Sequence, residues 1–296
     1  MNYIEIKNVS KTYGKKNVLK NVSFNIHNGM FGLLGHNGAG KTTLMKIMTT
    51  LVEPNKGKVF INDIDVSKNP IKVKEIIGFL PQEFNLYNEL NAVQMLDYIA
   101  RLNGIKSKKS RNIKIDEMLE RVNLKDACKE RLGGYSGGMK RRLGIALSLV
   151  KDPKVLIVDE PTAGLDPEER VRFRTMLVNL SEDKIVILST HIVEDISASC
   201  DQMVLLNKGK VDFVGNPDTW LQGVNGKIGE ICIEDRTKIG LIEKDHHIIS
   251  LKQVKNGVLV RVMIKEESKN ERINIVQPNL EDAYLYYTNL KKENIV

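Results

Sequence analysis

The chain has 296 residues, a formal net charge of +8, 42% hydrophobic residues and 28% charged residues, which is typical of a globular protein with one large or two modest domains. No apolar run approaches the ~18 residues needed to cross a bilayer, and the opening MNYIEIKNVSK lacks the apolar core of a signal peptide. We therefore expect a soluble chain that stays in the cytoplasm. The distant Cys128, Cys200 and Cys232 lack metal-ligand spacing and indicate buried or inert reduced thiols.

The first predicted elements surround a glycine-rich turn. Residues Tyr3–Ile26 alternate β-branched and polar side chains around Gly14, which predicts antiparallel strands. Met30–Leu34 is typical of a buried strand, and Thr43–Leu51 is typical of a helix. Between them lies GHNGAGKTT, which fits the P-loop spacing GxxxxGK followed by Ser or Thr. A plain strand-to-helix turn is the alternative, but the flanking elements favour phosphate binding.

The P-loop reading assigns a role to each part of this turn. Its glycines let successive backbone N–H groups point into one concavity at a helix N-terminus, which favours an anion. The lysine of this motif reaches the β and γ phosphates, and the following hydroxyl ligates magnesium. The predicted nucleotide-binding residues here are Gly35, His36, Asn37, Gly38, Ala39, Gly40, Lys41, Thr42 and Thr43.

The middle of the chain alternates strands and helices. A strand is expected in residues 57–66, and helices are expected in residues 89–104, 113–124 and 140–150. The apolar stretches KVLIVDEP and KIVILSTH, residues 154–161 and 184–191, follow as strands separated by one helix. This order predicts an α/β fold with a mostly parallel sheet covered on both faces, and a ligand beyond the carboxyl ends of its strands.

The densest basic run is Gly104–Lys114. A solvated loop is the default interpretation of such a run. A position near anionic headgroups is the sharper alternative, because each juxtamembrane Lys or Arg contributes about 1 kcal/mol. Nucleic acid ranks third, since the run contains no aromatic residue on which a base could stack, and we expect no nucleic-acid partner.

The character of the sequence changes near Pro217. We expect a first domain in residues 1–220 and a β-rich extension in residues 221–296. GEICIE and the stretch from His246 to Ile264 are typical of strands, and Asn256-Gly257 indicates a type I′ hairpin. The closing helix would place its apolar side chains on one face, at Leu280, Ala283, Tyr284 and Tyr287.

Two adjacent acids follow the predicted strand Val155–Val158. Adjacent residues at the end of a strand point in different directions, so Asp159 can serve a metal while Glu160 faces the water that attacks the γ-phosphate. Two carboxylates so near a triphosphate would repel it without a cation, which predicts Mg²⁺. An exposed acidic turn is the alternative.

With these motifs in place, the chain resembles the nucleotide-binding subunit of ATP-binding cassette (ABC) transporters. The resemblance covers residues 13–191 and implies a P-loop NTPase fold with an ABC-ATPase core: a mostly parallel sheet, an antiparallel β subdomain and a helical subdomain at about residues 84–150. It also implies ATP and Mg²⁺ as ligands and Mg-dependent ATP hydrolysis. The segments that carry it beyond the P-loop and the two acids are LPQEF, YSGGM, AGLDP and LSTHI.

The resemblance assigns further site residues. Tyr13 resembles the aromatic that stacks on adenine, and Gln82 the residue that contacts magnesium and water. Ser136, Gly137 and Gly138 resemble the signature sequence, which opens a helix and closes over ATP held by another cassette. Asp166 resembles the loop that links two cassettes. His191 resembles the switch histidine at the γ-phosphate. Taken one at a time, each of these residues has an ordinary structural explanation. Tyr13 could be a packing residue, Gln82 a loop amide, Ser136 with Gly138 a helix N-cap, and His191 a residue at a strand end. The assigned roles are catalytic for Glu160, His191 and Gln82, metal-binding for Thr42, Gln82 and Asp159, and nucleotide-binding for Tyr13, Ser136, Gly137, Gly138 and Asp166.

The signature departs from the family pattern, with Met139 in place of the usual Gln and Tyr135 in place of the common Leu. The phosphate-contacting Ser136 and both glycines remain, so we infer that the signature can still act on the nucleotide. Whether the two changes alter its discrimination between ligands or its turnover of ATP stays open.

The resemblance also implies partners: a second nucleotide-binding subunit, identical or related, and a separate transmembrane permease that holds the chain at the cytoplasmic face of the membrane. The helical subdomain and the tail are similar to those of the multidrug, antibiotic and polymer exporter branch. The alternatives are a soluble ABC-type ATPase of translation or DNA maintenance, and a nucleotide sensor that does not hydrolyse.

Overall fold

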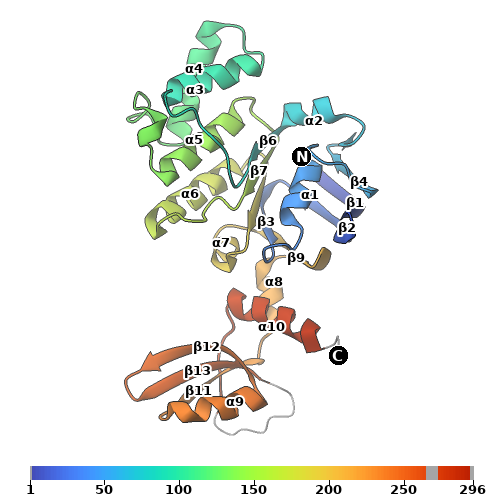
Figure 1. The fold of residues 1–296 in the computed structure, drawn as a ribbon, viewed down its shortest axis with the longest axis vertical. Coiled ribbons are helices and arrows are strands. Elements are labelled where there is room, and N and C mark those ends of the chain that lie inside the picture. The colour runs from blue at the N-terminus through green and yellow to red at the C-terminus, as the bar shows by residue number, and fades with distance from the viewer. Residues whose placement is uncertain (1, 265–272, 294–296) are drawn as a thin grey trace. The chain divides into compact units, whose positions relative to one another are not determined.

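The structure is a computed structural model that describes residues 2–264 and 273–293 (Figure 1). The parts of the predicted extension at residues 265–272 and 294–296 lie outside the described residues. The chain divides into two compact units, Met1–Val214 and Gly215–Val296. Within the described ranges, no helix has the length and apolar character needed to span a membrane.

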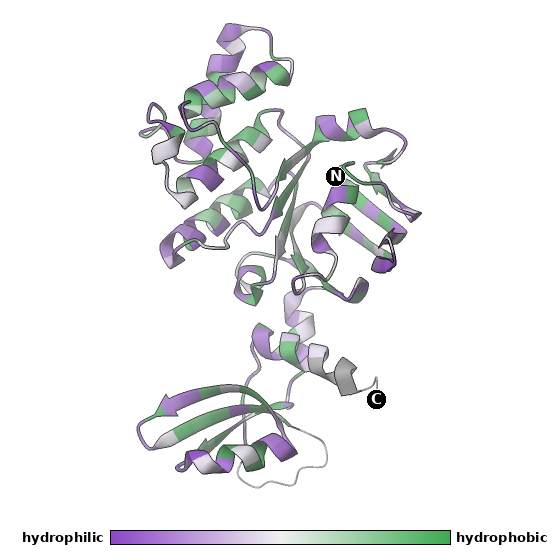
Figure 2. Cartoon of the chain, viewed as in Figure 1, coloured by the Kyte–Doolittle hydropathy of each residue, from purple (hydrophilic) through white to green (hydrophobic). Residues whose placement is uncertain are grey.

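A six-stranded sheet forms the centre of the first unit, in the order β10-β9-β3-β8-β7-β6. The pairs β9–β3, β3–β8, β8–β7 and β7–β6 are parallel, which confirms the predicted parallel sheet. Hydrophobic residues concentrate along these strands (Figure 2). The strands are β3 (Gly29–Leu34), β6 (Ile77–Leu80), β7 (Val155–Asp159), β8 (Ile185–Thr190), β9 (Gln202–Asn207) and β10 (Lys210–Gly215).

The first unit also contains an antiparallel sheet in the order β2-β1-β4-β5, as predicted for the β subdomain. One hydrophobic cluster joins its inner face to α1 and to the parallel sheet, so α1 is packed between the two sheets. The helix is shifted from the predicted 43–51, because Thr50 adopts a positive φ of 62° and ends it. These elements are β1 (Tyr3–Tyr13), β2 (Lys16–His27), β4 (Lys56–Ile61), β5 (Ile64–Asp65) and α1 (Lys41–Met48).

The remaining helices of the first unit are α2 (Pro70–Ile76), α3 (Ala92–Leu102), α4 (Lys108–Arg121), α5 (Gly137–Leu149), α6 (Pro167–Leu180) and α7 (Val193–Ser197). Figure 1 shows α3, α4 and α5 gathered at one end of this unit. Helix α4 begins five residues before the predicted 113, because the Ser107 hydroxyl accepts from the N–H of Ser110 and caps it. Much of the basic run is therefore helical, and the interpretation of the whole run as a loop is wrong.

In the described residues of the second unit, the sheet β12-β13-β11-β14 is accompanied by the helices α8, α9 and α10 and by a short 3-10 helix, Arg236–Lys238. The predicted hairpin is present, but Val254 pairs with Gly257, so the turn is centred on Lys255 and Asn256. The turn thus lies one residue before the predicted Asn256-Gly257. The elements are α8 (Pro217–Gln222), β11 (Ile228–Ile233), α9 (Ile239–Asp245), β12 (His247–Val254), β13 (Gly257–Met263), β14 (Asn274–Ile275) and α10 (Leu280–Glu293).

Helix α10 is held in this second unit by apolar and charged contacts. Leu280 and Ala283 are buried on the predicted apolar face. Tyr287 stacks on Trp220 of α8 with ring centroids 5.5 Å apart. Arg261 of β13 donates to both carboxylate oxygens of Asp282, at 2.9 and 2.6 Å. The domain boundary expected at residues 220–221 would fall inside α8.

The register of the parallel strands brings four chain segments to one edge of the sheet. Leu34 of β3 lies beside Thr190 of β8, and Asp159 of β7 lies beside Ser189. Leu80 of β6 lies beside Val158 of β7. The segments that follow β3, β6, β7 and β8 therefore leave the sheet together, where an open α/β sheet binds its ligand.

Candidate functional site

The P-loop leaves β3 and enters α1 through a turn that requires glycine at several positions. A Cβ atom on Gly35 would lie 2.3 Å from the carbonyl oxygen of Leu206. Gly38 and Gly40 have φ angles of 83° and 110°, in the left-handed region that other residues rarely adopt. The helix begins at Lys41, so its first N–H groups face this turn. The local structure fits the predicted anion cradle.

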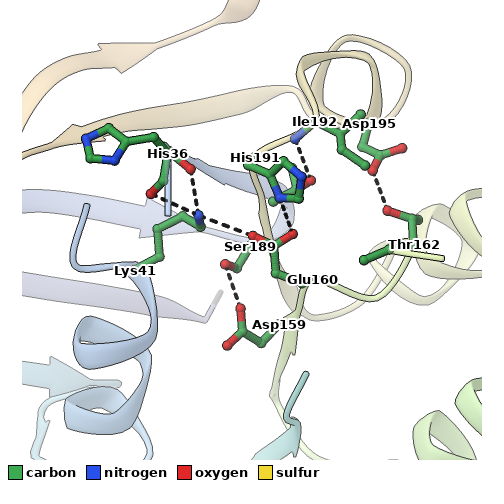
Figure 3. A network of polar contacts seen from close by, with 12 residues as sticks. His36, Lys41, Asp159, Glu160, Thr162, Ser189, His191, Ile192 and Asp195 are labelled. Carbon is green, nitrogen blue, oxygen red and sulfur yellow. Dashed lines mark hydrogen bonds and ion pairs between the residues drawn. The ribbon is translucent and has the colours of Figure 1, made fainter. Parts of the chain in front are cut away.

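Lys41 points into the site as an almost fully buried cation. Its Nζ donates to the carbonyl of Gly35 at 2.6 Å and lies 3.2 Å from Oε1 of Glu160 (Figure 3). Both side chains of this ion pair are only 6% exposed. Because little water screens this pair, the two charges attract each other strongly, and the pair links the P-loop to the end of β7.

Asp159 lies deeper, between the P-loop helix and β8. Its Oδ2 accepts from the Thr42 hydroxyl at 3.3 Å, and its Oδ1 accepts from the Ser189 hydroxyl at 2.9 Å. Burial raises the pKa of Asp159, while these two hydrogen bonds oppose the shift. Thr42 and Asp159 thus place two hard oxygen donors side by side, the chemistry that Mg²⁺ prefers.

Glu160 points away from Asp159, as expected for neighbours at a strand end. Its Oε2 lies 2.6 Å from Nδ1 of His191 (Figure 3). Its backbone has a φ of 48°, and its N–H donates to the carbonyl of Ser189 at 2.9 Å. The same carboxylate therefore contacts a cation from the P-loop and the imidazole that follows β8.

A pocket of about 380 Å³ is lined by Lys41 and Glu160. Tyr13 contributes a ring that is 46% exposed, with Nζ of Lys11 5.2 Å from its centroid. The pocket brings together predicted residues from four parts of the sequence: Tyr13, His36, Asn37, Gly38, Gly40, Lys41, Thr42, Thr43, Gln82 and Glu160. Lys16 and Val18 also line it, and no motif in the sequence singled them out.

Several predicted residues do not line this pocket, among them Asp159 and His191, which contact residues that do. Gly35 and Ala39 are buried, and Gly35 presents its carbonyl to Lys41. Ser136 caps α5, with its hydroxyl accepting from the N–H of Met139 at 3.2 Å, and Gly137 and Gly138 begin that helix. Asp166 caps α6 in the same way, accepting from the N–H of Glu169 at 2.8 Å. The described chain thus separates the signature residues from the P-loop pocket.

Tyr135 and Met139, the two signature residues that differ from the family pattern, lie in different environments. Tyr135 is buried, and its hydroxyl donates to the carbonyl of Ala127 at 2.8 Å. Burial raises the pKa of this phenol. Met139 is half-buried in the first turn of α5. Tyr135 therefore anchors the segment before α5, while the hydroxyl of Ser136 keeps its capping role.

Sequence reasoning missed the groups that hold the loop after Glu160. Arg141 of α5 donates to the carbonyls of Glu160 and Ala163 at 2.6 and 2.7 Å. Asp195 of α7 is fully buried and accepts from the Thr162 hydroxyl at 2.5 Å. The only signals in the sequence were the place of Arg141 three residues after Gly138 and an acid four residues after His191.

Comparison with known proteins identifies relatives that bind ATP. The family model described as ABC transporter matches residues 19–163. The linearmycin resistance ATP-binding protein LnrL of Bacillus subtilis is 35% identical over 72% of this chain and 68% of its own length. The daunorubicin resistance ATP-binding protein DrrA3 of Streptomyces coeruleorubidus is 30% identical over 96% of this chain and 95% of its own.

A solved structure shares the core of the fold. The ATP-binding cassette MJ0796, described as dimeric, in a post-hydrolysis state and bound to ADP and Pi, superimposes with a TM-score of 0.65. Its sequence is 28% identical, and the superposition covers 72% of this chain and 98% of the MJ0796 chain. The predicted fold and family are therefore confirmed, and the chain belongs to the ATP-binding proteins of the ABC transporter family.

Proposed function

We propose that this chain is the Mg²⁺-dependent, ATP-hydrolysing subunit of a membrane exporter. The observation that carries the proposal is the single pocket that unites Tyr13, the P-loop, Gln82 and Glu160, with the buried Lys41–Glu160 pair at its floor. An aromatic ring, an anion cradle and a poised carboxylate in one pocket match the three parts of ATP that such an enzyme handles: base, phosphates and scissile bond.

The P-loop would bind the triphosphate through its backbone N–H groups and Lys41. A γ-phosphate carries more charge than one carboxylate, so it would compete with Glu160 for the Lys41 ammonium. Losing this ion pair leaves Oε1 of Glu160 free to accept a hydrogen bond from a water molecule. Nucleotide binding would thus release the carboxylate that the reaction requires.

Thr42, Asp159 and Gln82 are the residues that would hold Mg²⁺. Magnesium is usually bound by one or two carboxylates together with substrate phosphates, and this donor set supplies one buried carboxylate, one hydroxyl and one amide oxygen. The burial that raises the pKa of Asp159 makes a nearby cation favourable. When bound, the metal neutralises charge that develops on the phosphates.

Glu160 would orient and activate the attacking water, with His191 as its partner. The imidazole within 2.6 Å of Oε2 fixes one face of the carboxylate, and the left-handed backbone of Glu160 aims the other toward the P-loop. His191 can also donate to the γ-phosphate once the Lys41–Glu160 pair has opened.

A second cassette would complete the site. Ser136, Gly137 and Gly138 do not line the pocket of their own chain, yet they form a capped helix N-terminus that suits an anion. We infer that they close over ATP held by a partner chain, identical or related, and that Asp166 lies at that interface. Hydrolysis removes the shared γ-phosphate and separates the two chains.

Export through a separate transmembrane permease is the direction we propose. LnrL and DrrA3 are named for resistance to antibiotics, and removal of the drug from the cell would explain such resistance. The chain would then work at the cytoplasmic face of the membrane, bound to the permease. A soluble ATPase of translation or DNA maintenance is one alternative. A sensor that does not hydrolyse is the other, and the test below addresses it.

Replacing Glu160 with Gln tests the proposal. We expect E160Q to bind ATP, to lose turnover by at least about 10²-fold, and to accumulate an ATP-bound dimer. Steady-state phosphate release and light scattering with and without Mg-ATP measure these effects. Lys41→Ala is the matched comparison and should weaken ATP binding itself. Unchanged turnover in E160Q would remove Glu160 from the mechanism, and absence of turnover in the wild type alone and with its membrane partner would favour the sensor.

A further inference from the structure

Arg141 links the helix that carries the signature to the backbone of Glu160. Its Nη1 donates to the carbonyl of Glu160 at 2.6 Å, and its Nη2 donates to the carbonyl of Ala163 at 2.7 Å. Both contacts are charge-assisted, and the planar guanidinium fixes their relative direction. One side chain of α5 thereby spans the loop that begins at Glu160.

Glu160 needs such support because of its backbone conformation. A φ of 48° is uncommon for a residue other than glycine, and it persists only where the surroundings hold it. The N–H of Glu160 is bound by Ser189 of β8. Arg141 binds its carbonyl, so both backbone polar groups of this residue are fixed, one from the sheet and one from α5.

In the part of the chain that the structure describes, the Arg141 guanidinium contacts backbone carbonyls of the loop instead of forming an ion pair, which supports a role in holding that loop. Among the described residues, no carboxylate lies within 4 Å of its guanidinium, so its donors serve the two loop carbonyls. Burial also lowers the pKa of Arg141 from its usual value. The neighbouring Arg142 contacts the carbonyl of Asn123 and the carboxylate of Glu169 instead.

The far side of the same loop is held independently of α5. The Thr162 hydroxyl donates to Asp195 of α7, and Asp195 also accepts from Arg174 of α6 at 3.3 Å. Loss of the Arg141 contacts would therefore leave the loop attached to α6 and α7. What it would lose is the two hydrogen bonds from α5, the helix that Ser136 caps.

We propose that Arg141 is a positioning residue that couples the placement of the signature helix to the orientation of Glu160. This inference rests on the proposed function of Glu160. When α5 is in place, the two carbonyl contacts hold Glu160 with its carboxylate toward the P-loop. When α5 moves, the Glu160 carbonyl is left with the 3.4 Å hydrogen bond from the N–H of Ala163 in its own loop. The carboxylate then loses its orientation, so a chain whose signature is misplaced hydrolyses ATP slowly.

The test compares Arg141→Gln with Arg141→Lys and with Arg142→Gln as the matched control from the same helix. We expect R141Q to lower kcat by about tenfold or more, with the KM for ATP changed by less than about twofold, because the P-loop contacts are untouched. A lysine offers a single charged point that reaches one carbonyl, so R141K should recover part of the loss. R142Q should leave kcat within about threefold of the wild type.

Hydrogen exchange gives a second readout that needs no turnover. R141Q should speed exchange of the backbone amides of residues 159–165 in the full chain, and R142Q should not. Unchanged exchange and kcat in R141Q would overturn the inference, as would an equal loss of kcat in R142Q. If the wild type proves unable to hydrolyse ATP, the proposed function fails, and the exchange data still decide whether Arg141 holds the loop.

Discussion

Asp159 and Glu160 show how two identical functional groups acquire different properties from their neighbours. The Asp159 carboxylate accepts hydrogen bonds from two hydroxyl groups, at 3.3 and 2.9 Å, and burial raises its pKa. Glu160 is as buried but lies between an ammonium and an imidazole. Among the described residues, the first carboxylate therefore has no cation in direct contact and only the more distant charge of Lys41, and a bound cation would supply the contact that it lacks.

This difference predicts that Asp159→Asn stabilises the chain. Because burial raises the pKa of Asp159, the folded chain binds its proton more tightly, and stability is lost as the pH rises from the unfolded carboxyl's range through the folded pKa. An amide stays neutral, so D159N should melt a few degrees higher at neutral pH, with the gain shrinking under acidic conditions. Calorimetry across pH measures this, and a lower melting temperature at neutral pH would contradict it.

The same variant should respond weakly to magnesium. The Oδ1 of an amide can still accept from one hydroxyl, but it brings no charge to a cation. We expect the Mg²⁺ affinity measured in the presence of ATP to fall by at least about tenfold. Ser189→Ala is the control, since it removes one hydrogen bond to Asp159 and leaves the carboxylate in place.

At the scale of elements, α6 depends on its N-cap. Asp166 accepts from the N–H of Glu169, and the Glu169 side chain packs against Gly138 and lies 3.6 Å from Nε of Arg142. The cap thus supports both α6 and its contact with the signature helix. Asp166→Ala should lower the free energy of unfolding by about 1 kcal/mol.

Asp166→Asn separates this role from one in binding. Asparagine caps as well as aspartate, so D166N should stay within about 0.5 kcal/mol of the wild type in equilibrium urea unfolding. Equal stability of D166A and D166N would show that the cap contributes nothing. A loss of ATPase activity in D166N, with stability retained, would support the proposed place of Asp166 at the interface.

The strands and the P-loop could be predicted because their signals are local. Val155–Val158 and Met30–Leu34 are short apolar runs whose length favours a buried strand, and a glycine-rich turn binds anions through its own backbone. Element ends were less predictable. A single hydroxyl, that of Ser107, starts α4 early, and one pairing, Val254 with Gly257, shifts the hairpin turn.

Contacts between distant segments could not be predicted from the sequence. Arg141 reaches carbonyls 19 and 22 residues away, and a carbonyl leaves no mark in a side-chain pattern. Asp195 pairs with Thr162 across 33 residues. Such partners depend on how α5, α6 and α7 pack, which the hydrophobic pattern of each helix leaves undetermined.

At the scale of the whole molecule, a site shared between two chains makes defects complementary. A chain with Lys41→Ala has an intact signature, and a chain with Ser136→Ala has an intact P-loop. Each should be nearly inactive alone. In a mixed dimer, the P-loop of the second chain meets the signature of the first, so one of the two sites is complete. Random pairing of equal amounts would restore roughly a quarter of the wild-type sites.

Phosphate release from the mixture measures this recovery. Lys41→Ala mixed with the double variant K41A/S136A is the matched control and should stay inactive, because no pairing assembles a complete site. Ser136→Ala also removes the hydroxyl that caps α5, so Ser136→Asn, which retains a capping acceptor, checks that the loss of turnover is not a loss of folding. If the first mixture also stays inactive while both variants fold and the wild type hydrolyses ATP, each pocket must work within its own chain, and the shared site would be wrong.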